Sequence, residues 1–176
     1  MLIFLRKAVI DDLNNIMAII DDAKKLLKAD NSSQWQNGTP NRDMFINDIN
    51  NDSCYVLVVD GDIAGVTTVL NTPDPNYKKI YNGSWIQQTN NYATFHRIAI
   101  SSKYRGKHFS DFLFSTLITT IYEMGYRDIR IDTHRLNKRM QHIIEKWNFK
   151  YCGIVKLPKN VDLLDNTRLT YELVLK

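Results

Sequence analysis

The segment from residue 94 to residue 125 constrains the fold more than any other part of this sequence. Residues 94–100 (TFHRIAI) are rich in β-branched and apolar side chains, which is typical of a strand. Residues 101–107 are polar and basic, and from Ser110 onward apolar side chains recur at helical spacing as far as Gly125. Glycine is common just beyond a helix end. The pattern therefore predicts a strand, a basic turn and a helix.

The basic turn suits an anionic ligand. A helix N-terminus presents free backbone N–H groups and about half a positive charge, so it attracts phosphate. The turn in front of the predicted helix adds Lys103, Arg105, Gly106, Lys107 and His108. It holds a single glycine, however, and neither the G-x-G-x-x-G pattern nor the Walker pattern occurs. A pyrophosphate site and an ordinary solvated loop both remain open for this turn.

Composition limits the class of protein. The chain has 176 residues, 44% hydrophobic and 24% charged, so we expect one globular domain over residues 1–176. No apolar run approaches the length of a membrane span, and the N-terminus lacks a signal-peptide pattern, which predicts a cytoplasmic protein without a membrane partner. A net charge of +4 suits an acidic cofactor and is too small to indicate nucleic acid. Cys54 and Cys152 lack metal-ligand spacing, which predicts buried thiols and no metal site.

The remaining segments alternate between strand and helix patterns. Residues 71–92 contain two prolines and no regular period, so they form either a functional loop or a short element that the sequence hides. Helices are predicted after Asp11 or Asp12, from Pro40 or Asn41, from Ser110, and from Asn137 to Trp147. Strands are predicted at 3–8, 55–59, 63–70, 94–100, 128–133, 151–157 and 168–175. This order predicts an α/β domain with a mixed sheet.

Three segments resemble the GNAT superfamily of acyl-CoA-dependent N-acyltransferases. They are H-R-I-A-I at 96–100, Y-R-G-K-H-F-S at 104–110, and D-T-H-R-L-N-K-R-M-Q followed by K-W-N-F-K-Y-C-G at 132–153. With the element order, the likeness covers nearly the whole chain. The resemblance implies a central mixed, mostly antiparallel sheet of about seven strands flanked by about four helices. It also implies acetyl-CoA as cosubstrate, and homodimers are frequent in the family.

The resemblance also implies which residues hold acetyl-CoA. The basic turn matches the family's pyrophosphate loop, with Arg105 in its first position. His108 and Ser110 stand where the family usually has glycine or alanine, so His108 must either avoid a positive φ or lose about 1 kcal/mol. The residues implied to bind the cosubstrate are Ile98, Ala99, Ile100, Arg105, Gly106, Lys107, His108, Phe109, Ser110 and Asn137.

Two residues are candidates for the catalytic base. An alkylammonium has a pKa of about 10, so acetyl transfer to an amine is helped by a group that removes a proton. Asp132 lies five residues before Asn137, where some family members carry a glutamate base; the alternative is a buried structural acid. His96 titrates in the right range, and its alternative is a core-edge histidine bonded to a carbonyl. Strand alternation groups His96 with Ile98 and Ile100.

The acceptor is predicted to contact Trp35 and His134. The stretch Q-W-Q-N-G-T-P resembles a bacterial subgroup with Q-W-x-x-G-Y-P, although Trp35 could instead fill the edge of the core. Alternation places His134 on the same strand face as Asp132. The family's tyrosine that protonates the leaving thiolate is replaced by Ile144. Two functions follow: an N-acetyltransferase acting on a primary amine of a small molecule or peptide, or a non-catalytic CoA- or acyl-CoA-binding module.

Overall fold

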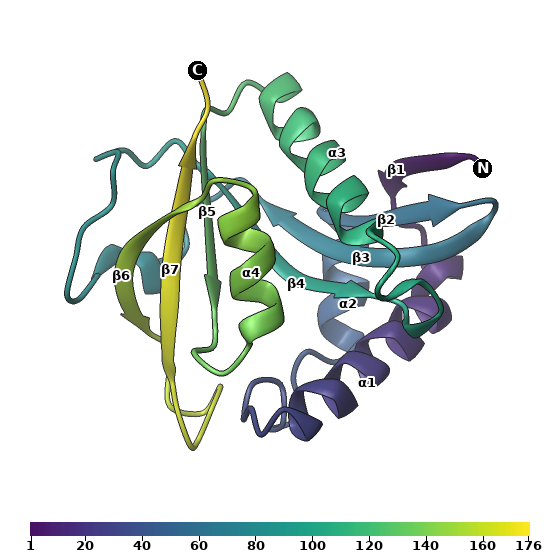
Figure 1. Cartoon of the computed structure of the whole chain (residues 1–176), viewed down its shortest axis with the longest axis horizontal. Coiled ribbons are helices and arrows are strands. Elements are labelled where there is room, and N and C mark those ends of the chain that lie inside the picture. The colour runs from purple at the N-terminus through teal and green to yellow at the C-terminus, as the bar shows by residue number, and fades with distance from the viewer.

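One seven-stranded sheet organises the chain, and the computed structural model describes all 176 residues (Figure 1). The strand order is β1-β2-β3-β4-β5-β7-β6, and every neighbouring pair is antiparallel except β4 and β5. This confirms the predicted mixed, mostly antiparallel sheet. The strands are β1 (Ile3–Lys7), β2 (Cys54–Val59), β3 (Asp62–Leu70), β4 (Ala93–Ile100), β5 (Asp128–Thr133), β6 (Lys150–Lys156) and β7 (Thr167–Val174).

Four α-helices cover the two faces of this sheet, as predicted. The helices α1 and α2 pack on one face, where Ile16 and Phe45 are fully buried, and α3 and α4 pack on the other, where Leu117 and Ile144 are fully buried. None of the helices has both the length and the apolar character needed to cross a membrane. Their bounds are α1 (Leu13–Ala29), α2 (Arg42–Asn50), α3 (Phe109–Glu123) and α4 (Lys138–Lys146).

The strands β4 and β5 run side by side for only three residues each. Pairing joins Ala93–Phe95 to Ile129–Ile131, and beyond these residues the two strands diverge (Figure 1). The divergence coincides with a bulge: the register between β3 and β4 shifts between Val66 and Thr68, and Arg97 has a left-handed φ of 54°. A bulge adds one residue to a strand and bends it. The edge of β4 that faces β5 is therefore left without a strand partner.

The same bulge changes which side chains share a face of β4. Simple alternation grouped His96 with Ile98 and Ile100, and this prediction is wrong. The two isoleucines pack against the core beneath α3 and α4, whereas His96 lies on the opposite face, with its ring centroid 6.3 Å from that of Tyr77. The extra residue of the bulge reverses the alternation after His96. The imidazole and the isoleucines consequently reach different sides of the sheet.

The segment between β3 and β4 is ordered by a short 3-10 helix, Pro75–Lys78. This helix is the short element that the sequence left open for residues 71–92. Tyr77 and Trp85 are buried in a small apolar cluster that includes side chains of β6, and Tyr81 forms an isolated antiparallel bridge with Ile154. The segment thus lies against the sheet beside the place where β4 and β5 diverge.

Arg130 of β5 holds this segment against the sheet. Its guanidinium lies 4.4 Å from the ring centroid of Trp85 and 3.9 Å from that of Tyr92. The same guanidinium is ion-paired with Asp128 at 3.1 Å and with Glu172 at 3.2 Å. Removing one partner from a buried ion pair is strongly destabilising, because it leaves an uncompensated charge. The aromatic and ionic contacts together fix the segment on the sheet.

Replacing Gly83 by alanine tests how far the fold depends on this packing. A β-carbon at Gly83 would overlap the carbonyl oxygen of Cys152 and crowd Gly153. Because backbone must move to relieve the overlap, we expect Gly83→Ala to lower the free energy of unfolding by about 1–3 kcal/mol in urea denaturation. Ser84 is an exposed neighbour, and Ser84→Ala should change the free energy of unfolding by less than about 0.5 kcal/mol. Equal stability of Gly83→Ala and the parent protein would contradict the close contact.

Candidate active site

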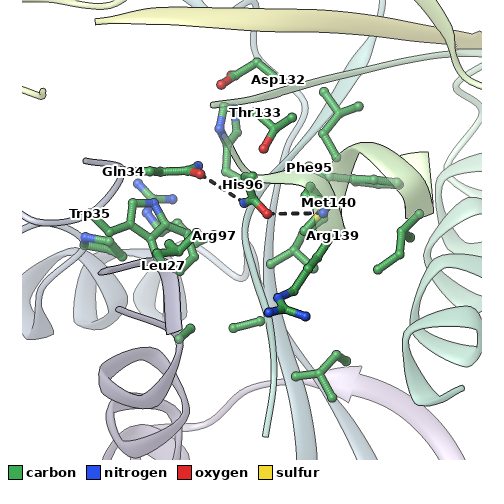
Figure 2. A pocket seen from close by; sticks show the side chains of 18 of the residues that line it. Leu27, Gln34, Trp35, Phe95, His96, Arg97, Asp132, Thr133, Arg139 and Met140 are labelled. Carbon is green, nitrogen blue, oxygen red and sulfur yellow. Dashed lines mark hydrogen bonds between the residues drawn. The ribbon is translucent and has the colours of Figure 1, made fainter. Parts of the chain in front are cut away.

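A cavity of about 570 Å³ opens where β4 and β5 diverge. Its walls come from these strands, the start of α4, the end of α1 and the loop that follows α1 (Figure 2). The turn before α3 also contributes to the wall. Two buried polar side-chain atoms on its wall, Nη2 of Arg105 and Oγ1 of Thr133, have neither a hydrogen-bond partner nor an ion pair. Buried polar groups are nearly always paired in folded proteins. Their concentration on one wall therefore points to a ligand site.

The turn before α3 leaves the N-terminus of this helix open. His108 occupies the N-cap position with a left-handed φ of 62°, and no side chain caps the first turn. His108 thus adopts the conformation that the sequence left in question, at a cost of about 1 kcal/mol. Gly106 has a φ of 70°, which glycine adopts without strain. Because Phe109 and Ser110 also line the cavity, the free N–H groups of this helix end are available to an anion.

Arg105 adds a directed positive charge at the same end. Its Nε donates to the carbonyl oxygen of Ile100 at 3.2 Å, and its Nη2 is buried without a partner. A guanidinium held in this way suits phosphate oxygens. Lys107 does not line the cavity, and its ammonium donates to the carbonyl oxygen of Lys103 at 2.9 Å. The donors that fit a pyrophosphate are therefore Arg105 and the helix end, without Lys107.

Asn137 ties α4 to the loop that carries Trp35. Its side-chain oxygen accepts from the Met140 N–H at 3.2 Å, and its side-chain amide donates to Oε1 of Gln34 at 3.0 Å (Figure 2). Asn137 lines the cavity, and both of its polar side-chain atoms are already engaged in shaping the wall. Trp35 lines the cavity beside it and also packs against the core beneath α1 and α2. Ile98, Ala99 and Ile100 complete this part of the wall along the free edge of β4.

His96 lies within a group of acidic and phenolic side chains at the other end of the cavity. Its Nε2 is 3.4 Å from Oδ2 of Asp74. The Tyr77 hydroxyl donates to Oδ2 of Asp132 at 2.7 Å. Asp74, His96 and Asp132 all line the cavity, whereas Tyr77 is buried behind them. The structure thus brings the two predicted base candidates together and adds two residues that were not predicted.

Burial controls the protonation of this group. It lowers the pKa of His96, and the negative charges of Asp132 and Asp74 offset part of that effect. The imidazole is therefore neutral at pH 7 and able to accept a proton. Burial, reinforced by the Asp132 carboxylate, raises the pKa of Tyr77 well above its ordinary value of 10. Tyr77 consequently remains a donor that holds the Asp132 carboxylate in place.

His134 does not belong to this wall. Strand β5 ends at Thr133, and His134 is 1% exposed and outside the cavity lining. Its two ring nitrogens each lie 3.3 Å from a hydroxyl oxygen, one of Ser32 and one of Ser33. The side chain thus anchors the loop after α1 to the end of β5. An acceptor in the cavity would have no access to it.

Asp74 and Tyr77 are the residues that the sequence reasoning missed. They lie in the 71–92 segment, whose irregular sequence carries no period to place them. One signal was present, because an aspartate between two prolines is suited to cap a short turn, and Asp74 does accept from the Asn76 N–H at 2.8 Å. The position of the family's tyrosine that protonates the leaving thiolate is occupied by Ile144, which is fully buried in the core and has no proton to donate. Thr133 instead offers a buried, unpartnered hydroxyl on the cavity wall.

Comparisons with known proteins identify the family. The sequence model of the acetyltransferase (GNAT) family matches residues 20–149. A solved GNAT-family acetyltransferase from Streptococcus agalactiae 2603 is 35% identical, with a TM-score of 0.87 over 99% of this chain and 96% of that chain. The chain therefore belongs to the GNAT family of acetyltransferases, which use acetyl-CoA as cosubstrate.

More distant structures share the fold. An N-acetyltransferase from Staphylococcus aureus Mu50 is 24% identical, with a TM-score of 0.69 over 100% of both chains. The ribosomal-protein-S18-alanine N-acetyltransferase from Escherichia coli is 13% identical, with a TM-score of 0.65 over 99% of this chain and 95% of that chain. No curated protein matches the sequence. The fold is thus common to proteins with very different sequences.

Arg105 and Lys107 provide a matched test of the cosubstrate site. Arg105→Gln removes the unpartnered guanidinium from the wall, whereas Lys107→Gln removes an equal charge outside the cavity. A hydrogen bond to a charged group contributes about 1.5–3 kcal/mol. We therefore expect Arg105→Gln to raise the Kd of acetyl-CoA at least about tenfold and Lys107→Gln less than about threefold, measured by calorimetry. Equal increases in the Kd of acetyl-CoA for the two variants would show that the turn acts through net charge alone.

Proposed function

We propose that this protein transfers an acetyl group from acetyl-CoA directly to a primary amine of a small molecule or peptide. The observation that carries the proposal is the position of His96, a neutral imidazole that shares the cavity wall with the carboxylates of Asp74 and Asp132. The opposite end of the same cavity gathers Arg105 and the open N-terminus of α3. One end therefore suits the phosphates of the donor, and the other suits proton removal from the acceptor.

Proton removal is the task of the His96 end. An alkylammonium has a pKa of about 10 and arrives protonated at pH 7, so it must lose a proton before its nitrogen attacks. The lone pair of the neutral His96 imidazole would take that proton, and Oδ2 of Asp74 lies 3.4 Å from its Nε2. The Asp74 and Asp132 carboxylates stabilise the imidazolium that forms. Asp132, the other predicted base, is in this proposal a stabilising charge held in place by Tyr77.

The donor end positions the thioester. Arg105 and the first turn of α3 would hold the pyrophosphate, and the free edge of β4 at Ile98–Ile100 would offer backbone groups to the pantetheine arm. Acetyl-CoA would supply the activated acetyl group: the C–N bond forms as the C–S bond breaks, and the second proton of the attacking nitrogen passes to the departing sulfur or to water. A thiol has a pKa of about 8.5, so the sulfur leaves as a thiolate at little cost. Ile144 in place of a proton donor is compatible with this chemistry.

His96→Gln separates base catalysis from cosubstrate binding. A positioned base contributes about 100-fold or more to a rate, so we expect kcat to fall at least about 100-fold in a thiol-release assay with a panel of primary amines. The Kd of acetyl-CoA should stay within about threefold of the parent value, because His96 lies at the acceptor end. His142 is exposed on α4, and His142→Gln serves as the control. Acetyl-CoA binding without thiol release on any amine would favour the non-catalytic module.

The pH dependence of kcat tests the role of Asp132. Because burial lowers the pKa of His96 below its ordinary value of 6.5, kcat should fall as the pH drops through that pKa, and the midpoint of this acid limb should lie below pH 6.5. The Asp132 charge raises the pKa of His96, so Asp132→Asn should move the acid limb to lower pH and reduce the plateau. A lower plateau with an unmoved acid limb would mean that Asp132 supports the fold without acting on His96.

A further inference from the structure

The charges on the cavity wall are separated into two ends. Arg105 provides an unpaired cation at the α3 end. At the other end Asp74 and Asp132 line the wall, and no lysine or arginine pairs with either carboxylate. Asp132 accepts from the neutral Tyr77 hydroxyl, and the ionisable neighbour of Asp74 is His96, which burial keeps neutral by lowering its pKa. This end therefore retains two uncompensated negative charges.

The other charged groups around the cavity do not cancel them. Each remaining arginine on the wall is already bound to a carboxylate, namely Arg97 to Asp48 at 3.0 Å, Arg139 to Asp30 at 3.0 Å and Arg168 to Asp162 at 3.1 Å. Asp48 also accepts from the Thr68 hydroxyl at 2.7 Å, which holds its pair with Arg97 in place. The acceptor thus meets a wall whose unpaired charge is negative.

Two uncompensated carboxylates make a simple monoamine a poor acceptor. They would stabilise the ammonium form of the attacking nitrogen as well as the imidazolium of His96, so they would give a monoamine no net help in losing its proton. A second ammonium in the same molecule removes this difficulty, because it compensates the carboxylates while the first nitrogen becomes neutral. An acceptor with a carboxylate or phosphate near its amine would instead be repelled.

We propose that the acceptor is a small aliphatic diamine or polyamine, whose non-reacting ammonium is bound at the Asp74–Asp132 end of the cavity. This inference rests on the proposed function and adds the substrate class. The chain between the nitrogens would meet apolar wall residues, which include Leu27, Trp35, Met44 and Leu70. Methylene groups placed against such side chains gain from leaving water.

Three acceptors that share a four-carbon chain test the substrate class: the far end is an ammonium in 1,4-diaminobutane, a methyl group in 1-aminobutane and a carboxylate in 4-aminobutanoate. We expect kcat/KM for the diamine to exceed that for 1-aminobutane at least about tenfold and that for 4-aminobutanoate at least about 100-fold. Asp74→Asn should reduce the diamine-to-monoamine ratio to within about threefold of unity. Asp43 is an exposed carboxylate of α2 outside the cavity lining, and Asp43→Asn should keep the parent ratio.

Calorimetry of the same three amines on the CoA complex separates this inference from the proposed function. Tighter binding of the diamine, lost in Asp74→Asn and kept in Asp43→Asn, supports the substrate class whether or not turnover follows. Equal affinity and equal turnover of the diamine and the monoamine would overturn the substrate class and leave the acetyltransferase proposal standing. Preferential binding of the diamine without any thiol release would contradict the proposed function instead.

Discussion

The separation of β4 from β5 is the constraint on which the rest of the site depends. A continuous parallel pair would fill the space that the cavity occupies, and simple alternation would keep His96 on the isoleucine side of the sheet. The bulge prevents both, and Arg97 at its centre holds a left-handed φ of 54° while pairing with Asp48 at 3.0 Å. A strained backbone of this kind persists only where its surroundings over-determine it. The ion pair and the hydrogen bond from Thr68 to Asp48 provide that support.

The cavity also concentrates features that weaken a fold and serve a ligand. Unpartnered groups of Arg105 and Thr133, an uncapped α3 and the left-handed His108 each cost stability. They lie together on one wall, whereas the cores beneath the helices are apolar. The arrangement gives the cavity a cationic end and an anionic end. A donor rich in phosphate and an acceptor rich in ammonium can therefore approach one reaction centre from opposite sides.

Much of the fold was predictable because each helix and strand has a local sequence pattern. Apolar residues at helical spacing predict the helices, and β-branched runs predict the strands. The basic turn with Gly106 predicts the end of the cavity that suits an anion. The acceptor end was less predictable, because it is set by contacts between distant segments. Asp74 and Tyr77 are placed by the packing of residues 71–92 against Arg130. His134 is held outside the cavity by its contacts with the serines of the loop after α1. The bulge that puts His96 and the two isoleucines of β4 on opposite faces has no periodic sequence pattern either.

The position of the cosubstrate is best measured in a crystal structure of the complex with CoA, because it locates both ends of the cosubstrate relative to the diverging strands. We expect the pyrophosphate on Arg105 and the first turn of α3. We also expect the sulfur between β4 and β5, close enough to His96 for an amine, alone or with one water, to bridge them. CoA bound elsewhere, or with its sulfur screened from His96 by the sheet, would contradict the proposed site.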